Sequence, residues 1–299
     1  MNNSNSGETK VKLNLQQVYD HILADCTEEI ISELATTPTT DPFRFEADFG
    51  YAVRALALFQ MKRYDEALVY ARKALEINSN IADRSKILDE KTWSATWTDS
   101  NNYFFVLANY ILNMSELCYR TFSPEFMALY EPGDYVRYYS DEKDWNAYEE
   151  HQKGAPGSYI YAGSSARINT YGVTSEMMHY LAGECLIRQG KIDEGLDMVD
   201  KVRTYRIHPS KFAPFKGTTS NQGEAIAMLR KAKTVECIGN YMNFFDNKRF
   251  NSEPEYAADI NHNCGDLGTF TVKAGSPLWI YPFPMNATSY NSTLTQNIK

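Results

Sequence analysis

RALALFQMKRYDEALVYARKALEIN, residues 54–78, is the stretch that decides the fold, because AGECLIRQGKIDEGLDMVDKVR, residues 182–203, repeats its pattern. The offset between the two is 128 residues, so that Ala55 corresponds to Gly183. Each stretch predicts two antiparallel helices joined by a tight turn, with small residues where the helices touch. Acidic residues follow each turn, at the start of the second helix, where the backbone dipole is positive.

This spacing of small residues is the tetratricopeptide pattern. A further correspondence, Ala67 with Gly195, falls on the helix that follows the turn. A single helix pair of this kind cannot bury its apolar face, so two copies far apart in the sequence must dock on each other or on other helices. The sequence therefore predicts a mainly all-α protein built on tetratricopeptide-like helix pairs.

The composition supports a sizeable core and excludes two classes of partner. Of 299 residues, 43% are hydrophobic and 23% are charged, as in ordinary globular proteins. The net charge of -8 argues against binding to nucleic acid or to an anionic lipid surface. The five cysteines show no CxxC or disulfide-framework spacing. Cys185 and Cys237 lie in apolar helical stretches and are expected to be small buried hydrophobic residues.

We expect one helical domain over residues 1–299. Its expected parts are a disordered tail (1–12), the first helices and first repeat (13–80), an irregular aromatic-rich insertion (81–170), the second repeat (171–206), and a C-terminal helix and strap (221–299). A segment as long as the insertion is usually functional or disordered in a compact domain. Its many tyrosine and tryptophan residues argue against disorder.

Three finer expectations concern the two ends of the chain. The apolar stripe over residues 13 to about 34 predicts one continuous helix. A second continuous helix is expected from about residue 224 to 250. Paired prolines among aromatic residues near the C-terminus predict an extended strap rather than a helix.

Four segments together resemble one protein family. They are VYDHILADCTEEIISEL (18–34), DMVDKVR (197–203), ECIGNYMNFFDNKRF (236–250) and PLWIYPFPMNATSYNSTLTQN (277–297). Their order and motifs are similar to those of the SusD/RagB family of outer-membrane nutrient-binding lipoproteins of Bacteroidetes, over nearly the whole chain. The third segment is divergent, because residues 240–243 replace a Glu-Gly-His-Arg stretch of the family. Family members are longer and begin with a signal peptide and a lipidated cysteine. The first residues here match neither, so the chain is expected to lack the usual N-terminal region.

The resemblance implies binding rather than catalysis. Family members capture extracellular glycans, or peptides in some branches, and pass them to a SusC-like TonB-dependent transporter. We therefore expect a cell-surface protein on the extracellular face of the outer membrane, with an oligosaccharide or polysaccharide ligand. No cofactor, no metal and no nucleic acid is expected.

Ligand binding of this kind requires aromatic rings for the apolar faces of sugars, with amide and charged side chains for the hydroxyl groups. The insertion carries both kinds of residue. Some of its rings, such as Trp93, Trp97 and Tyr103, could instead pack the insertion onto the repeats. The candidate ligand-binding residues are Trp93, Trp97, Asn101, Tyr103, Asp134, Tyr135, Arg137, Tyr138 and Trp145.

Other chemistries fit the sequence less well. Glu149 and Glu150 are adjacent, so on a helix they point in different directions and cannot act as a glycosidase pair. DINHNCGD (259–266) is similar to the start of a calcium loop, but its glycine comes one position late, and a turn is the preferred interpretation. The chain carries no GxSxG, HExxH, P-loop or GxGxxG motif.

The rival hypothesis is a tetratricopeptide-type protein–protein adaptor or peptide-binding surface protein. An adaptor needs a long contiguous array of repeats with an exposed concave face. Two copies that are separated by about a hundred residues do not provide one, which favours the nutrient-binding hypothesis.

Overall fold

The computed structural model describes residues 11–36, 44–85, 103–108, 121–122, 124–135, 159–160, 171–237, 240–264, 267–291 and 293–297. Within them, no helix is long and apolar enough to span a membrane.

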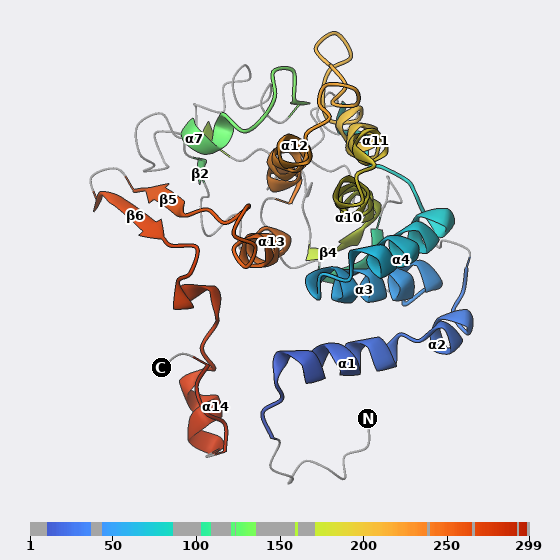
Figure 1. Ribbon diagram of the computed structural model, residues 1–299. Helices are drawn as coiled ribbons and strands as arrows, with labels where there is room; N and C mark the ends of the chain where they lie inside the picture. Colours follow the sequence, from blue (N-terminus) through green and yellow to red (C-terminus); the bar gives the residue numbers. More distant parts are fainter. Residues whose placement is uncertain are drawn as a thin grey trace.

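Two helix pairs form the centre of the fold (Figure 1). The first pair is α3 (Ala47–Gln60) and α4 (Tyr64–Ile77). The second pair is α10 (Ser175–Arg188) and α11 (Ile192–Arg203). Helix α10 packs on α4 as well as on α11, so the pairs stack on each other despite their distance in the sequence. The predicted tetratricopeptide-like arrangement is confirmed.

Small residues allow the two helices of the second pair, α10 and α11, to lie close together. A Cβ atom on Gly195 would lie 2.5 Å from the carbonyl oxygen of Gly183, and a Cβ atom on Gly183 would lie 2.9 Å from the carbonyl oxygen of Gly195. Both distances are far shorter than van der Waals contact, so neither position accepts a larger residue without moving a backbone. The two glycines thus fix how near α10 and α11 lie.

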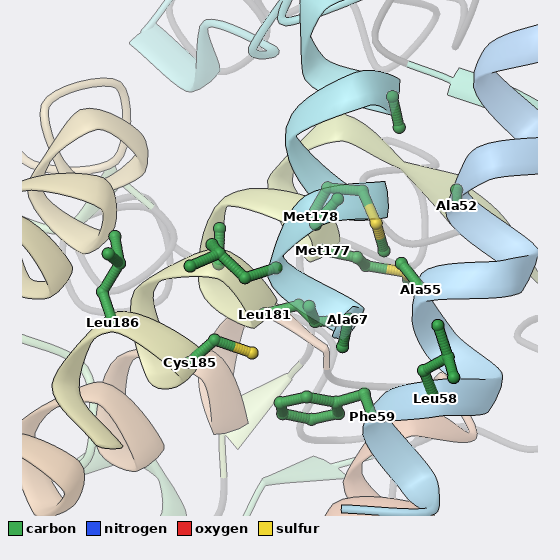
Figure 2. Packing of buried hydrophobic residues seen from close by; sticks show 14 of the residues in the cluster. Ala52, Ala55, Leu58, Phe59, Ala67, Met177, Met178, Leu181, Cys185 and Leu186 are labelled. Atoms are coloured by element: carbon green, nitrogen blue, oxygen red, sulfur yellow. The ribbon is translucent and has the colours of Figure 1, made fainter. Parts of the chain in front are cut away.

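The two pairs share one hydrophobic core (Figure 2). Ala55, Leu58 and Phe59 of α3 face Leu181 and Cys185 of α10 across this core. A second cluster continues behind α10, where α11 packs against α12 (Gln222–Glu236). Cys185 and Cys237 are buried, as the sequence predicts.

The helix expected from about residue 224 to 250 is divided in two. Helix α12 ends at Glu236, and α13 begins only at Met242 and runs to Phe250. The Asn240 Oδ1 accepts a hydrogen bond from the Met242 backbone N–H at 3.0 Å, which starts the new helix. An asparagine side chain competes well for backbone hydrogen bonds at such helix starts, and the periodicity did not reveal this.

The N-terminal helix is also divided, into α1 (Leu15–Asp25) and α2 (Glu28–Ser32). The hydroxyl of Thr27 accepts a hydrogen bond from the Ile30 backbone N–H at 3.3 Å and so caps the second part. None of the residues of α1 is fully buried. The continuous helix predicted from the apolar stripe is therefore wrong in this detail, because a strong capping residue interrupts the stripe.

Described strands pair in three antiparallel two-stranded sheets. Strand β1 (Tyr103–Ala108) pairs with β4 (Tyr171–Thr174), and β2 (Thr121–Phe122) pairs with β3 (Tyr159–Ile160). A short helix, α7 (Pro124–Met127), follows β2. Strands β1, β2 and β3 and helix α7 lie within the predicted insertion (81–170), whereas β4 lies at the start of the range expected for the second repeat (171–206).

The third sheet is a hairpin of β5 (Ile260–Asn263) and β6 (Thr269–Val272), which projects at the left of Figure 1. It contains the segment that is similar to a calcium loop. Asp259 accepts hydrogen bonds from Lys273 and from the Ala274 backbone, while Asn261 accepts one from Thr271. These oxygen atoms therefore hold the hairpin together.

The C-terminal strap is not extended throughout. It contains a 3-10 turn, η4 (Pro277–Trp279), and a short helix, α14 (Met285–Tyr290). Proline permits helix in the first turn, and Pro284 stands just before α14, so the paired prolines did not exclude a helix here.

Candidate functional site

Six of the nine candidate ligand-binding residues lie outside the described residues. They are Trp93, Trp97, Asn101, Arg137, Tyr138 and Trp145. The other three, Tyr103, Asp134 and Tyr135, lie where the insertion meets the helical scaffold.

Tyr103 begins β1, and its Cα atom pairs with Thr174 on β4. Thr174 is also the N-cap of α10, and its hydroxyl accepts a hydrogen bond from the Met177 backbone N–H at 3.4 Å. The start of β1 is therefore attached directly to the start of the most buried helix.

Asp134 and Tyr135 are attached to the end of α11. Asp134 forms an isolated β-bridge with Ile207, and the backbone N–H of Tyr135 donates to the Arg206 carbonyl at 3.0 Å. The ring of Tyr135 meets the ring of His208 edge to face, with 6.3 Å between centroids. Asp134 is only 4% exposed, so this carboxylate faces the protein rather than the solvent. Tyr135 is half-buried, and of the two it is the more accessible to a ligand.

A bidentate ion pair also attaches the segment around Asp134 and Tyr135 to α11. The guanidinium of Arg203 on α11 donates to both oxygen atoms of Glu131, at 2.8 and 2.6 Å. The Arg203 guanidinium also lies 3.3 Å from the centroid of the Phe215 ring. Paired N–H donors with fixed geometry position a carboxylate more precisely than a lysine would. The stretch that carries Asp134 and Tyr135 is therefore held firmly on α11.

A cluster of buried charged side chains surrounds Arg206, the residue whose carbonyl group binds Tyr135. Arg206 donates to Glu236 of α12 at 2.7 and 2.9 Å and to Glu176 of α10 at 3.0 Å. Arg84 lies 3.2 Å from the same Glu236. Burial by itself would raise the pKa of Glu236, but the two guanidinium charges outweigh it and hold this pKa at about 2. The cluster joins α10, α11 and α12 around the backbone that carries Tyr135.

A second buried cluster joins α10 to α13. Arg249 donates to Glu184 at 2.6 and 2.8 Å, and Arg188 donates to Glu184 at 2.8 Å. Glu253 accepts from Arg188 at 2.7 Å and from the Tyr64 hydroxyl at 2.8 Å. These carboxylates are satisfied by fixed donors, as buried charges must be. They build the scaffold and do not line a reactive surface.

Sequence reasoning did not single out these clusters, although one signal was present. Glu176 and Glu184 stand among apolar residues on a helix whose residues from Ser175 to Ile187 are all buried. A carboxylate in such a stripe requires an arginine or lysine partner. The identity of that partner was hidden, because Arg206 and Arg249 lie 30 and 65 residues further along the chain.

Two other features are poorer candidates for a site. A surface hollow of about 600 Å³ lies beside the turn between α10 and α11, but no aromatic ring lines it; its lining is Gly190, Lys191, Ile192, Asp193, Glu194, Gly217, Thr218, Thr219 and Ser220. Among the described residues, no group of three or more His, Cys, Asp or Glu side chains could hold a metal ion.

Comparison with known proteins gives one repeat family and one group of solved structures. The tetratricopeptide repeat family matches residues 49–81, which include most of α3 and all of α4. No curated protein matches the chain.

Three solved structures from Bacteroides represent the structural neighbours. A SusD superfamily protein from Bacteroides thetaiotaomicron has a TM-score of 0.72 at 15% identity, covering 100% of this chain and 70% of that one. A SusD-like carbohydrate binding protein from Bacteroides vulgatus has a TM-score of 0.66 at 14% identity, covering 98% and 68%. Surface glycan-binding protein A from Bacteroides uniformis has a TM-score of 0.67 at 13% identity, covering 98% and 71%.

Proposed function

Because this chain has the SusD-like fold, we propose that it is a cell-surface binding protein that captures an oligosaccharide or polysaccharide. It delivers this ligand to a SusC-like TonB-dependent transporter at the extracellular face of the outer membrane. The observation that carries the proposal is the likeness in fold, over almost the entire chain, to proteins described as carbohydrate binding and glycan-binding. The protein acts by binding alone, without a catalytic step.

The ligand is held by the insertion. Its tryptophan and tyrosine rings stack on the apolar faces of sugars, and Asn101 and Arg137 bind hydroxyl groups. The firm attachment of the segment around Tyr135 to α11 supports this assignment, because a preorganised site loses less entropy when ligand binds.

Replacing Trp93 and Trp97 together by alanine tests the proposal. We expect the wild-type protein to be retarded in native gels that contain amylopectin, dextran, xylan, galactomannan or mucin, and calorimetry to give a dissociation constant between about 1 mM and 1 μM, or about -4 to -8 kcal/mol. The double variant loses this binding, since it lacks two stacking surfaces, and it keeps its helical circular dichroism. Retention of full binding by the folded variant would exclude these rings from the site.

A matched control is Tyr290→Ala, which removes a ring that is 92% exposed on α14. It should bind as the wild type does. Loss of helical circular dichroism in the tryptophan variant would mean that these rings pack the insertion onto the repeats. Absence of wild-type retardation on every polysaccharide would overturn the proposed function.

The rival function, a tetratricopeptide-type adaptor for peptides, finds less support. An adaptor exposes the inner helices of its repeats to the peptide. Here the residues of α10 from Ser175 to Ile187 are buried on every side, against α4, α11 and α12. That helix has no free face for a peptide.

A further inference from the structure

A group of neighbouring aromatic rings lies away from the insertion, where α13 meets the C-terminal strap. We call it the aromatic platform; its members are Tyr241, Phe244, Phe245, Trp279 and Tyr281. The Phe244 ring is central, with its centroid 4.9 Å from that of Tyr281, 5.5 Å from that of Trp279 and 5.7 Å from that of Phe245. Segments some 40 residues apart in the sequence thus contribute to one surface.

Three of these rings are open to solvent. Tyr281 is 65% exposed, Tyr241 is 57% exposed and Phe245 is 43% exposed. Tyr241 and Phe245 are separated by one helical turn, so they lie on the same side of α13. Contiguous exposed apolar surface on a soluble protein is a common mark of a binding site.

Hydrogen bonds hold the segments that carry the platform in place. Trp279 is buried behind Phe244, and its indole N–H donates to the Lys273 carbonyl at 3.0 Å. The amide of Asn297 donates to the Tyr281 carbonyl at 3.1 Å, which fixes the strap beneath that ring. On the other side, the Asn243 amide donates to the carbonyl groups of Thr234 and Cys237, at 2.9 and 3.2 Å, and fixes the start of α13.

The chemistry of these rings fits carbohydrate better than it fits a protein helix. An amphipathic helix binds in a hydrophobic groove, whereas the platform offers flat rings at the surface. The Phe244 ring packs against one face of the Tyr281 ring, since the centroids are 4.9 Å apart and the planes are tilted by 32°. Tyr281 is nevertheless 65% exposed, so its other face is open to a ligand. Flat rings stack on the apolar face of a pyranose, and the phenol hydroxyls of Tyr241 and Tyr281 can hydrogen-bond its hydroxyl groups.

We propose that the aromatic platform is a second carbohydrate subsite, which stacks on pyranose units of the polysaccharide held by the insertion. The inference rests on the proposed function. A second subsite on the same chain raises affinity for long ligands through the effective concentration of the tethered sugar, and leaves short oligosaccharides bound at the insertion alone.

The test uses the full chain and one polysaccharide, the one that retards the wild-type protein most in the native gels described above. We expect the Tyr241→Ala/Tyr281→Ala variant to bind this polysaccharide about ten-fold more weakly than the wild type, while the Tyr290→Ala control is unchanged. The Tyr241→Phe/Tyr281→Phe variant keeps the rings and is expected to retain most of the affinity. Circular dichroism checks that every variant is folded.

Nitration of tyrosines gives a second readout that needs no substitution. The polysaccharide is expected to protect Tyr241 and Tyr281 from tetranitromethane, and to leave Tyr290 as reactive as before, in peptides analysed by mass spectrometry. Equal polysaccharide binding by the folded alanine variant, together with unprotected Tyr241 and Tyr281, would overturn the subsite while the proposed function stands. In that case the platform would be a contact surface for a protein. If no polysaccharide retards the wild type, both proposals fall.

Discussion

The two helix pairs have the same backbone at their turns and different chemistry inside. Lys62 in the first pair has a φ of 61°, and Gly190, 128 positions later, has a φ of 80°. The residues that follow these two are alike as well: Arg63 has φ -86° and ψ 64°, and Lys191 has φ -88° and ψ 62°. The repeat therefore specifies a turn geometry that lysine and glycine both adopt.

The chemistry differs at the first buried acid of each pair. Asp48 of α3 corresponds to Glu176 of α10, and Asn78 after α4 corresponds to Arg206 after α11, each at the same offset. In the second pair, Arg206 neutralises Glu176 at 3.0 Å. In the first pair the partner is the neutral Asn78, and burial raises the pKa of Asp48 to about 6 despite hydrogen bonds from the Phe49 backbone and Asn78.

A third difference lies in the middle of the first helix. Leu56 of α3 is partly buried in the core, whereas the corresponding Glu184 of α10 holds Arg249 and Arg188. At this position the first pair thus makes apolar contacts. The second pair also binds α12 and α13 through charges, which makes it the centre of the fold.

We expect the largest loss of stability when Glu184 of the second helix pair is replaced by leucine, the residue at the corresponding position of the first pair. Glu184→Leu leaves Arg249 and Arg188 buried without their shared carboxylate. We expect the free energy of unfolding to fall by about 3 to 5 kcal/mol, measured by urea denaturation. Glu194→Leu, at an exposed position in the first turn of α11, is the control and should lower stability by only about 0.3 to 1 kcal/mol, from the lost interaction with the helix dipole. A loss below about 1 kcal/mol for Glu184→Leu would show that the charges do not anchor the second pair.

The second-largest expected loss of stability compares the interface between α10 and α11 with the interface between α3 and α4. Gly195→Ala places a Cβ atom 2.5 Å from the Gly183 carbonyl oxygen and 2.6 Å from Ile187 Cγ1. We expect a destabilisation of about 2 to 3 kcal/mol, because α10 and α11 must move apart. The reverse exchange in the first pair, Ala67→Gly, should cost only about 1 kcal/mol from helix propensity. Thermal unfolding of both variants compares them, and equal losses would mean that the two interfaces are equally close.

The smallest effect concerns pH. The folded-state pKa of Asp48, about 6, is above its unfolded value, so the folded state binds this proton more tightly and loses stability as pH rises through the range from about 4 to 6. Asp48→Asn removes this dependence. We expect the stability of the wild type relative to this variant to fall by about 1 to 2 kcal/mol between pH 4 and pH 7. A constant difference across that range would contradict the raised pKa.

The sequence predicted the helix pairs well, because their signal is local. Helical spacing of small and apolar residues reports which face is buried, and Ala55 and Gly183 marked the contact between helices from the pattern alone. Local capping was harder to read. Thr27 caps α2, and the Asn240 side chain turns the backbone just before α13, inside stretches whose continuous apolar pattern predicted single helices.

For the candidate site, the sequence indicated aromatic residues but not which of them share a surface. It predicted that the ligand binds to the insertion. Of the candidate residues there, the structure describes Tyr103, Asp134 and Tyr135, which lie where the insertion contacts the helical scaffold. It did not single out Tyr241 and Tyr281, because each lies in a segment that resembles a structural motif of the family. Their common surface depends on where the strap crosses α13.

The sequence by itself determined the tetratricopeptide-like helix pairs and the burial of Cys185 and Cys237. Both follow from residues that interact within a few helical turns. Only the tertiary structure decided that Arg206 serves both Glu176 and Glu236, that Arg249 serves Glu184, and that the aromatic platform exists. The physical reason is that a charge or a ring can reach many partners along a chain, and only the docking of distant helices selects one of them.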